Sequence, residues 1–167
     1  MRRPNDPLSI ALGSFRSAIR KRKNVEPSEQ DRKVLEPLLD KLLDTDPSKL
    51  KSNVSTVKQK YKSSTIRQLL DLLVERMLRE RSSLAAQALV NFGSEAIPSL
   101  ERAFYRAPDP VAQEVLARTV VELIPYLTAA RCRQLRVTMM LWLRHAAGDS
   151  ARYAVAAALT ALKERLD

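Results

Sequence analysis

The chain has 167 residues, of which 45% are hydrophobic and 29% are charged, and this balance is typical of a globular domain rather than of a disordered chain. Its single cysteine, Cys132, excludes an intramolecular disulfide and a cysteine-based zinc site. The net charge of +10 favours nucleic acid, an anionic membrane or an acidic protein as a partner. Residues 1–81 hold most of the excess, with 19 Lys or Arg against 11 Asp or Glu.

The composition also bears on fold class and location. With only 3 glycines and 5% aromatic residues, a core built mainly from Leu, Val, Ile and Ala favours packed helices over a sandwich or barrel. No apolar run approaches the roughly 18 residues of a membrane span, and the basic start (1–15) lacks the longer apolar stretch and cleavage site of a secretory signal. We therefore expect a single cytoplasmic all-α domain over 1–167, with a basic helical N-terminal half (1–81) and helix pairs over 82–167.

Apolar residues recur at steps of three and four along nearly the whole chain, which is the spacing of amphipathic helices. Asp-Pro pairs at Asp6-Pro7, Asp46-Pro47 and Asp109-Pro110 are typical of helix starts. Pro37 predicts either a kink or a split after Leu35. The connections are short, which predicts antiparallel neighbours. About eight or nine helices are expected, near 7–22, 28–44 (one or two helices), 47–61, 64–80, 82–92, 95–106, 110–124, 129–146 and 150–166.

Short polar residues and a glycine refine these boundaries. Ser63 and Ser64 are placed to cap the helix that follows them, because a serine oxygen accepts a hydrogen bond from a first-turn N–H. For the same reason Ser94 is expected to cap the helix after it, and Thr128 to begin another. Gly93 stands where a helix should end in a left-handed cap.

Residues 84–124 follow the order of a helix-pair repeat. An Ala-rich first helix ends at Gly93, Ile97-Pro98 opens a second helix, and Asp109-Pro110 opens the next pair. This segment resembles HEAT repeats, the resemblance extends more weakly to residue 166, and Ala112 and Gln113 depart from it where Lys or Arg is frequent. The resemblance implies antiparallel helix pairs stacked as a short α-solenoid, which binds partners along a curved face.

No pattern of residues for catalysis, metal binding or cofactor binding stands out. The single histidine, His145, follows Cys132 by thirteen residues in one predicted helix, or about 20 Å along its axis, so the two cannot form a dyad. His145 suits a helix C-terminus, and Cys132 suits a core. The glycines are too few for a phosphate-binding loop, and the carboxylates Asp40, Asp44 and Asp46 are better explained as helix-end residues than as metal ligands. We expect no enzyme and no small-molecule ligand.

Three basic clusters are the candidate contacts for phosphate or for an acidic partner. They contain Arg16, Arg20, Lys21, Arg22 and Lys23; Lys51, Lys58, Lys62 and Arg67; and Arg131, Arg133 and Arg136. Cations at the end of a helix complement its dipole, which is a sufficient structural explanation for the first cluster. The second lies in an acid-free stretch, where a solvated helix face and anion binding explain the cations equally well, and its lysines at i, i+7 and i+11 should share one helical face. The third opposes the dipole of its helix, which favours a bound anion or an acidic partner.

The sequence thus predicts a non-enzymatic helical-repeat interaction module, an adaptor or subunit of a larger assembly, with a protein or nucleoprotein partner. The alternative is a sequence-independent nucleic-acid-binding protein that contacts DNA or RNA phosphates. Membrane insertion is not expected, because residues 49–61 have few large apolar side chains. An exposed apolar patch would favour the first hypothesis, and convergence of the cations on one face would favour the second.

Overall fold

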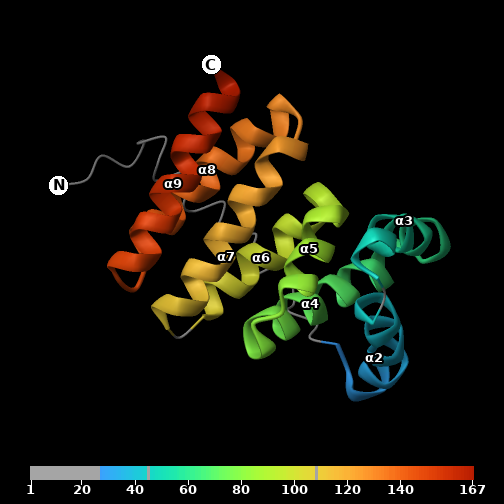
Figure 1. Ribbon diagram of the computed structural model, residues 1–167. Coiled ribbons are helices and arrows are strands. Elements are labelled where there is room, and N and C mark those ends of the chain that lie inside the picture. Colours follow the sequence, from blue (N-terminus) through green and yellow to red (C-terminus); the bar gives the residue numbers. More distant parts are fainter. Residues whose placement is uncertain (1–26, 45, 108) are drawn as a thin grey trace, which may run out of the picture. The chain divides into compact units, whose positions relative to one another are not determined.

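The computed structural model describes residues 27–44, 46–107 and 109–167, which form helices and no strand (Figure 1). The all-α class is therefore confirmed for these residues, and the helix expected near 7–22 lies outside them. The chain divides into two compact units, Met1–Arg32 and Lys33–Asp167. The helices are α2 (Glu29–Leu43), α3 (Leu50–Lys60), α4 (Ser63–Glu80), α5 (Ser83–Phe92), α6 (Ile97–Arg106), α7 (Pro110–Leu123), α8 (Ala129–His145) and α9 (Asp149–Leu166), with 3-10 turns η1 (Pro47–Lys49), η2 (Gly93–Ala96) and η3 (Ile124–Tyr126).

Three of the predicted helix starts are confirmed by their hydrogen bonds. The side chain of Asp46 accepts from the Ser48 N–H at 3.0 Å at the start of η1, and α3 follows directly. Asp109 accepts from the Ala112 N–H at 2.8 Å and caps α7, with Pro110 as the first helical residue. Thr128 accepts from the Arg131 N–H at 3.3 Å and caps α8. Each of these N–H groups would otherwise lack a partner in the first turn.

Two of the predicted caps are wrong. Helix α4 begins at Ser63, and its N-cap is the extended Lys62, so the serines lie one step too late to fold back onto the first turn. Ser94 lies inside η2, and this 3-10 turn runs directly into α6. The residue before α6, Ala96, already has helical angles, so no extended residue precedes the helix and no side chain caps it.

Helix α2 passes through Pro37 without a break, so the predicted split after Leu35 is wrong. Pro37 has no N–H to donate to the carbonyl of Lys33, and its ring lies on the exposed side of the helix. Leu35, Leu39 and Leu42 are all buried on the other side. Burial of leucines before and after the proline outweighs the one missing hydrogen bond.

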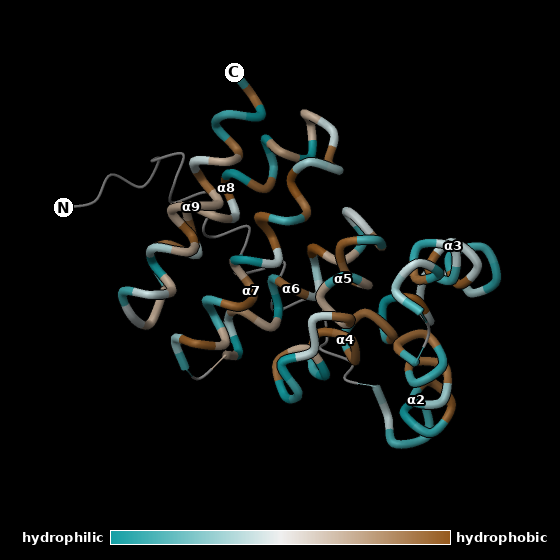
Figure 2. Tube along the Cα trace, in the orientation of Figure 1, coloured by the Kyte–Doolittle hydropathy of each residue, from teal (hydrophilic) through white to brown (hydrophobic). Residues whose placement is uncertain are grey.

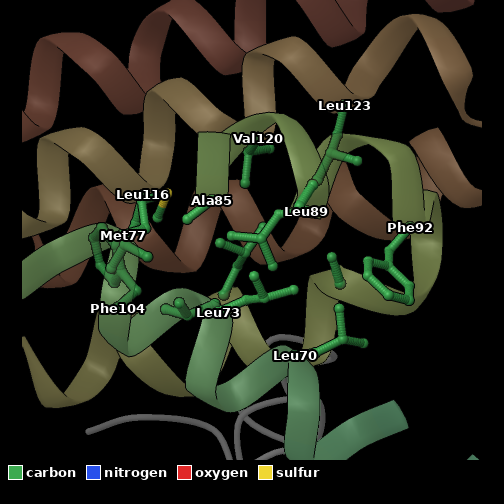
Figure 3. Close-up of a cluster of buried hydrophobic side chains, with 14 of the residues drawn as sticks. Leu70, Leu73, Met77, Ala85, Leu89, Phe92, Phe104, Leu116, Val120 and Leu123 are labelled. Atoms are coloured by element: carbon green, nitrogen blue, oxygen red, sulfur yellow. The ribbon is translucent and has the colours of Figure 1, made fainter. Parts of the chain in front are cut away.

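In the unit Lys33–Asp167, each helix from α4 to α9 contacts a neighbour in sequence and also the next helix but one. The adjacent pairs α4–α5, α6–α7 and α8–α9 pack together, while α3–α5, α5–α7, α7–α9, α4–α6 and α6–α8 contact across the pairs. Along these helices, apolar residues alternate with polar ones, so that each helix has apolar residues for its contacts with other helices (Figure 2). The buried side chains form one cluster that runs from Leu35 to Leu162. Its middle holds Met77 of α4, Leu89 of α5 and Phe104 of α6 (Figure 3).

Polar side chains tie several of these helices together. Arg76 of α4 donates hydrogen bonds to Asp40 and Glu36 of α2, and the bond to Asp40 raises the pKa of Arg76 above its ordinary value. Gln113 of α7, one of the two residues that depart from the HEAT pattern, is buried. Its Nε2 donates to the Phe104 carbonyl at 3.4 Å, and its Oε1 accepts from the Ala147 N–H at 2.7 Å. Gln113 thereby joins the end of α6 to the connection before α9.

Candidate interaction surface

The basic residues of the second cluster lie on two different helices. Lys51 and Lys58 belong to α3, which ends at Lys60, and the extended Tyr61 and Lys62 then lead into α4. The prediction that the three lysines share a helical face is therefore wrong, because the step from Lys58 to Lys62 crosses the end of the helix. All three, and Arg67 in α4, are exposed. The first cluster, Arg16 to Lys23, lies outside the described residues.

Lys58 has a structural role. Its Nζ lies 3.1 Å from Glu95 Oε1 and donates to the Phe92 carbonyl at 3.4 Å. These contacts join α3 to the end of α5 and neutralise the lysine charge locally. Within the described residues, Lys51, Lys62 and Arg67 have no such ion pair. The effective charge of this cluster is thus smaller than the sequence suggests.

The arginines of the third cluster lie on α8, whose inner side is fully packed. Cys132, Leu135, Met139 and Trp142 are buried there, and α8 contacts α9 and α6. The Trp142 ring stacks on Phe104 of α6, with 4.0 Å between ring centroids and an interplanar angle of 13°. Cys132 is a core residue, as predicted. This packing holds the backbone of α8 in place and fixes which side chains point outward.

Helix α8 has a second apolar row on its outer side. Val137, Met140 and Leu143 are exposed by 57%, 49% and 37%. Successive residues turn by about 100° around a helix, so these three lie within a third of a turn of one another. Arg133, Arg136 and Arg144 project from the same side. We call these six residues the α8 outer face.

Within the part of the chain that the structure describes, no acidic side chain compensates the charge of the α8 outer face. No Asp or Glu occurs from residue 123 to residue 148. In the described part of the chain, Arg133, Arg136 and Arg144 make no ion pair. Arg131 points about 200° away from Arg133 around the helix, and its Nη1 donates to Gln134 Oε1 at 3.3 Å. The structure therefore places Arg133 and Arg136 together and sets Arg131 apart.

The two basic surfaces lie on helices with different neighbours. Lys51 and Lys58 are on α3, which packs on α5, whereas the arginines are on α8, which packs on α9 and α6 (Figure 1). The cations of the second and third clusters therefore lie on two separate helices.

Sequence reasoning missed the apolar part of the α8 outer face, although a signal was present. The buried residues of α8 follow the steps Cys132, Leu135, Met139 and Trp142. Val137, Met140 and Leu143 fall outside this row and form a second row at three-residue steps. A helix with two apolar rows and arginines beside one of them has more apolar surface than a single packing contact covers.

At the C-terminal end of α8, His145 is exposed and lies edge-on to the Tyr105 ring, with 5.6 Å between ring centroids. Burial of Tyr105, with a smaller effect of the Glu101 carboxylate, raises the pKa of its phenol to about 12.

Across residues 27–44, 46–107 and 109–167, no three His, Cys, Asp or Glu side chains gather in an arrangement that could hold a metal ion. In the same ranges, each helix is too short or too polar to cross a bilayer.

Comparison with protein-family models, curated proteins and solved structures finds no match to this chain. The case for a function therefore depends on the geometry and charge of the chain's own residues. Among these, the α8 outer face combines exposed apolar area with arginines that make no ion pair within the described residues.

Proposed function

We propose that the chain is a non-enzymatic helical-repeat interaction module, an adaptor or subunit of a larger assembly, that binds a protein partner through the α8 outer face. One observation carries this proposal: Val137, Met140 and Leu143 are exposed side by side on a helix whose other side is already packed. A helix at the surface of a protein ordinarily turns polar residues outward. Clustered apolar side chains on a folded surface are typical of binding sites.

The arrangement of the helices supports a HEAT-like α-solenoid of about eight or nine helices. In such a stack each helix contacts its own pair and the matching helix of the next pair, which is the pattern of α4–α6–α8 and α5–α7–α9. Helix α5 ends at Gly93 and α7 begins after Asp109, as the repeat pattern predicts, but α5 packs on α4 and α6 packs on α7, so the packed pairs are shifted by one helix from the pair read in the sequence. A stack of this kind offers helix faces to a partner and needs no catalytic group.

Affinity capture from the native cell tests the proposal. The bait is the full chain, compared with the double variant Val137→Gln, Met140→Gln and with a matched control, Val34→Gln, which changes an exposed valine on α2. Glutamine keeps the helix and removes apolar contact. Burial of each side chain contributes about 1.5–3 kcal/mol, so the double variant should lose at least about tenfold of the captured partner. Equal recovery by the double variant and the control would rule out the α8 outer face.

The alternative function, sequence-independent binding of DNA or RNA, is favoured by a different observation. Lys51, Lys62 and Arg67 are exposed and have no ion pair among the described residues. Polarisation binding to mixed-sequence single- and double-stranded DNA and RNA, at about 50 and 200 mM salt, tests it. If the chain binds phosphates, its affinity should fall steeply as salt rises. The double variant Lys51→Gln, Lys62→Gln should also bind more weakly than the control Lys58→Gln, whose lysine is paired with Glu95. Absence of binding at low salt would eliminate this alternative.

A further inference from the structure

The spacing of the α8 outer face is that of a helix–helix contact. Arg133, Val137, Met140 and Arg144 follow steps of four, three and four residues, the spacing at which side chains of one helix fit between those of another. From Arg133 to Arg144 the helix rises by roughly 16 Å, which is about three turns. The row has two apolar side chains in the middle and a cation at each end.

The charges beside this row favour an acidic occupant. Helix α8 contains no Asp or Glu, and Asp149, at the start of α9, lies 3.7 Å from Arg152. A second copy docked face to face would oppose arginines with arginines, which is unfavourable. Carboxylates, in contrast, form paired hydrogen bonds with guanidinium groups, and such bonds are stronger than those between neutral groups.

The chemistry of the middle of the row distinguishes among anionic partners. Val137, Met140 and Leu143 are aliphatic, and bases of single-stranded nucleic acid stack on aromatic rings, which this face does not have. A membrane-surface helix buries a broad apolar side with its cations on the polar side, whereas here Arg133 and Arg144 lie in line with the apolar row. Met and Arg together are typical of protein–protein interfaces.

We infer that the α8 outer face binds an acidic amphipathic helix of a protein partner. The partner helix has apolar residues at steps of three and four that meet Val137 and Met140. Its Asp or Glu residues, about three turns apart, meet Arg133 and Arg144. This inference rests on the proposed function and adds the chemistry of the partner to it.

A displayed library of 18-residue helical peptides tests the inference. Its central positions vary among Leu, Ala and Gln, and its flanking positions vary among Glu, Lys and Gln. Peptides are selected for binding to the full chain, to the charge-reversed variant Arg133→Glu, Arg144→Glu, and to the control Arg131→Glu, whose change lies elsewhere on the same helix. The chain and the control should enrich peptides with Glu on both sides of Leu, and the reversed variant should enrich Lys. The enriched Glu peptide should bind the reversed variant at least about tenfold more weakly.

Three outcomes of the peptide selection would overturn the inference: no enriched peptide, enriched peptides without a charge preference, or equal binding to the reversed variant. The same chain is also measured with a mixed-sequence RNA and with phosphatidylcholine vesicles containing phosphatidylserine. The inference also fails if the Arg133→Glu, Arg144→Glu variant no longer binds the RNA or the vesicles and the peptides do not compete with that ligand for the unchanged chain. The face would then bind phosphate groups. If the peptide test fails but the Val137→Gln, Met140→Gln variant still loses its captured partner, the inference about the partner's chemistry is wrong and the proposed function is retained.

Discussion

At the scale of single residues, the backbone of Arg81 is unusual. It ends α4 with φ of 50° and ψ of 39°, the left-handed conformation, and it is the one non-glycine residue of the described chain with positive φ. Side chains with a Cβ are strained in this conformation by about 1–2 kcal/mol, whereas glycine adopts it freely. At the end of α5 the sequence has Gly93, with φ of 71°.

We therefore expect Arg81→Gly to raise the free energy of unfolding by about 0.5–1 kcal/mol, because the relief of strain exceeds the added entropy of the unfolded chain. Arg67→Gly, at an exposed helical position of α4, should instead lower it by about 1 kcal/mol. Urea unfolding of the three proteins measures both changes. A destabilised Arg81→Gly protein would show that the arginine side chain makes a contribution larger than the strain.

The raised pKa of Tyr105 predicts a dependence of stability on alkaline pH. The folded protein holds the phenol neutral up to about pH 12, against an ordinary pKa of 10.0, chiefly because the side chain is buried. Since the folded pKa is higher than the unfolded one, the contribution of Tyr105 to stability is complete below pH 10 and is lost as pH rises towards 12.

Urea midpoints at pH 9 and pH 11.5 measure this loss. Tyr105→Phe cannot ionise, so its midpoint should fall less over this range than that of the unchanged protein. The control is Tyr126→Phe, which alters an exposed tyrosine. Its midpoint should fall as much as that of the unchanged protein, because the three proteins share all other titrating groups. Equal losses in all three proteins would contradict the role assigned to Tyr105.

At the scale of elements, adjacent residues of α8 have opposite environments. Trp142 is buried against Phe104, and Leu143 is on the α8 outer face. Trp142→Ala should lower the free energy of unfolding by about 3–5 kcal/mol, because it removes the largest side chain of the contact between α8 and α6. Leu143→Ala should change it by less than about 1 kcal/mol. Circular dichroism in urea follows both variants, and similar losses would mean that Leu143 is packed within the fold.

At the scale of the whole molecule, the buried side chains form one cluster from α2 to α9. A continuous core predicts that the unit Lys33–Asp167 unfolds in a single transition. Leu39→Ala, in α2, should lower the free energy of unfolding by about 2–5 kcal/mol. In this variant, the urea midpoint measured by the fluorescence of Trp142, in α8, should shift and should equal the midpoint measured by circular dichroism. Separate midpoints would show that the helix pairs unfold independently.

The sequence determined the features that depend on neighbours along the chain. The starts of α7 and α8 were predictable because Asp109 and Thr128 bond to N–H groups three residues away. The end of α5 at Gly93 was predictable because glycine adopts a positive φ without strain, although its ψ of −138° is not that of a left-handed cap. The helical class followed from the spacing of apolar residues, which is also local.

Only the tertiary structure decided which residues of each helix are covered. Lys58 looked like a free cation until the fold placed Glu95 beside it, and Met139 and Met140 are neighbours in sequence yet only one is buried. Pro37 remained inside α2 because leucines on both sides of it are buried in the core. The physical reason is common to all three: local spacing sets the direction of a side chain, but burial and ion pairing depend on helices brought together from distant parts of the chain.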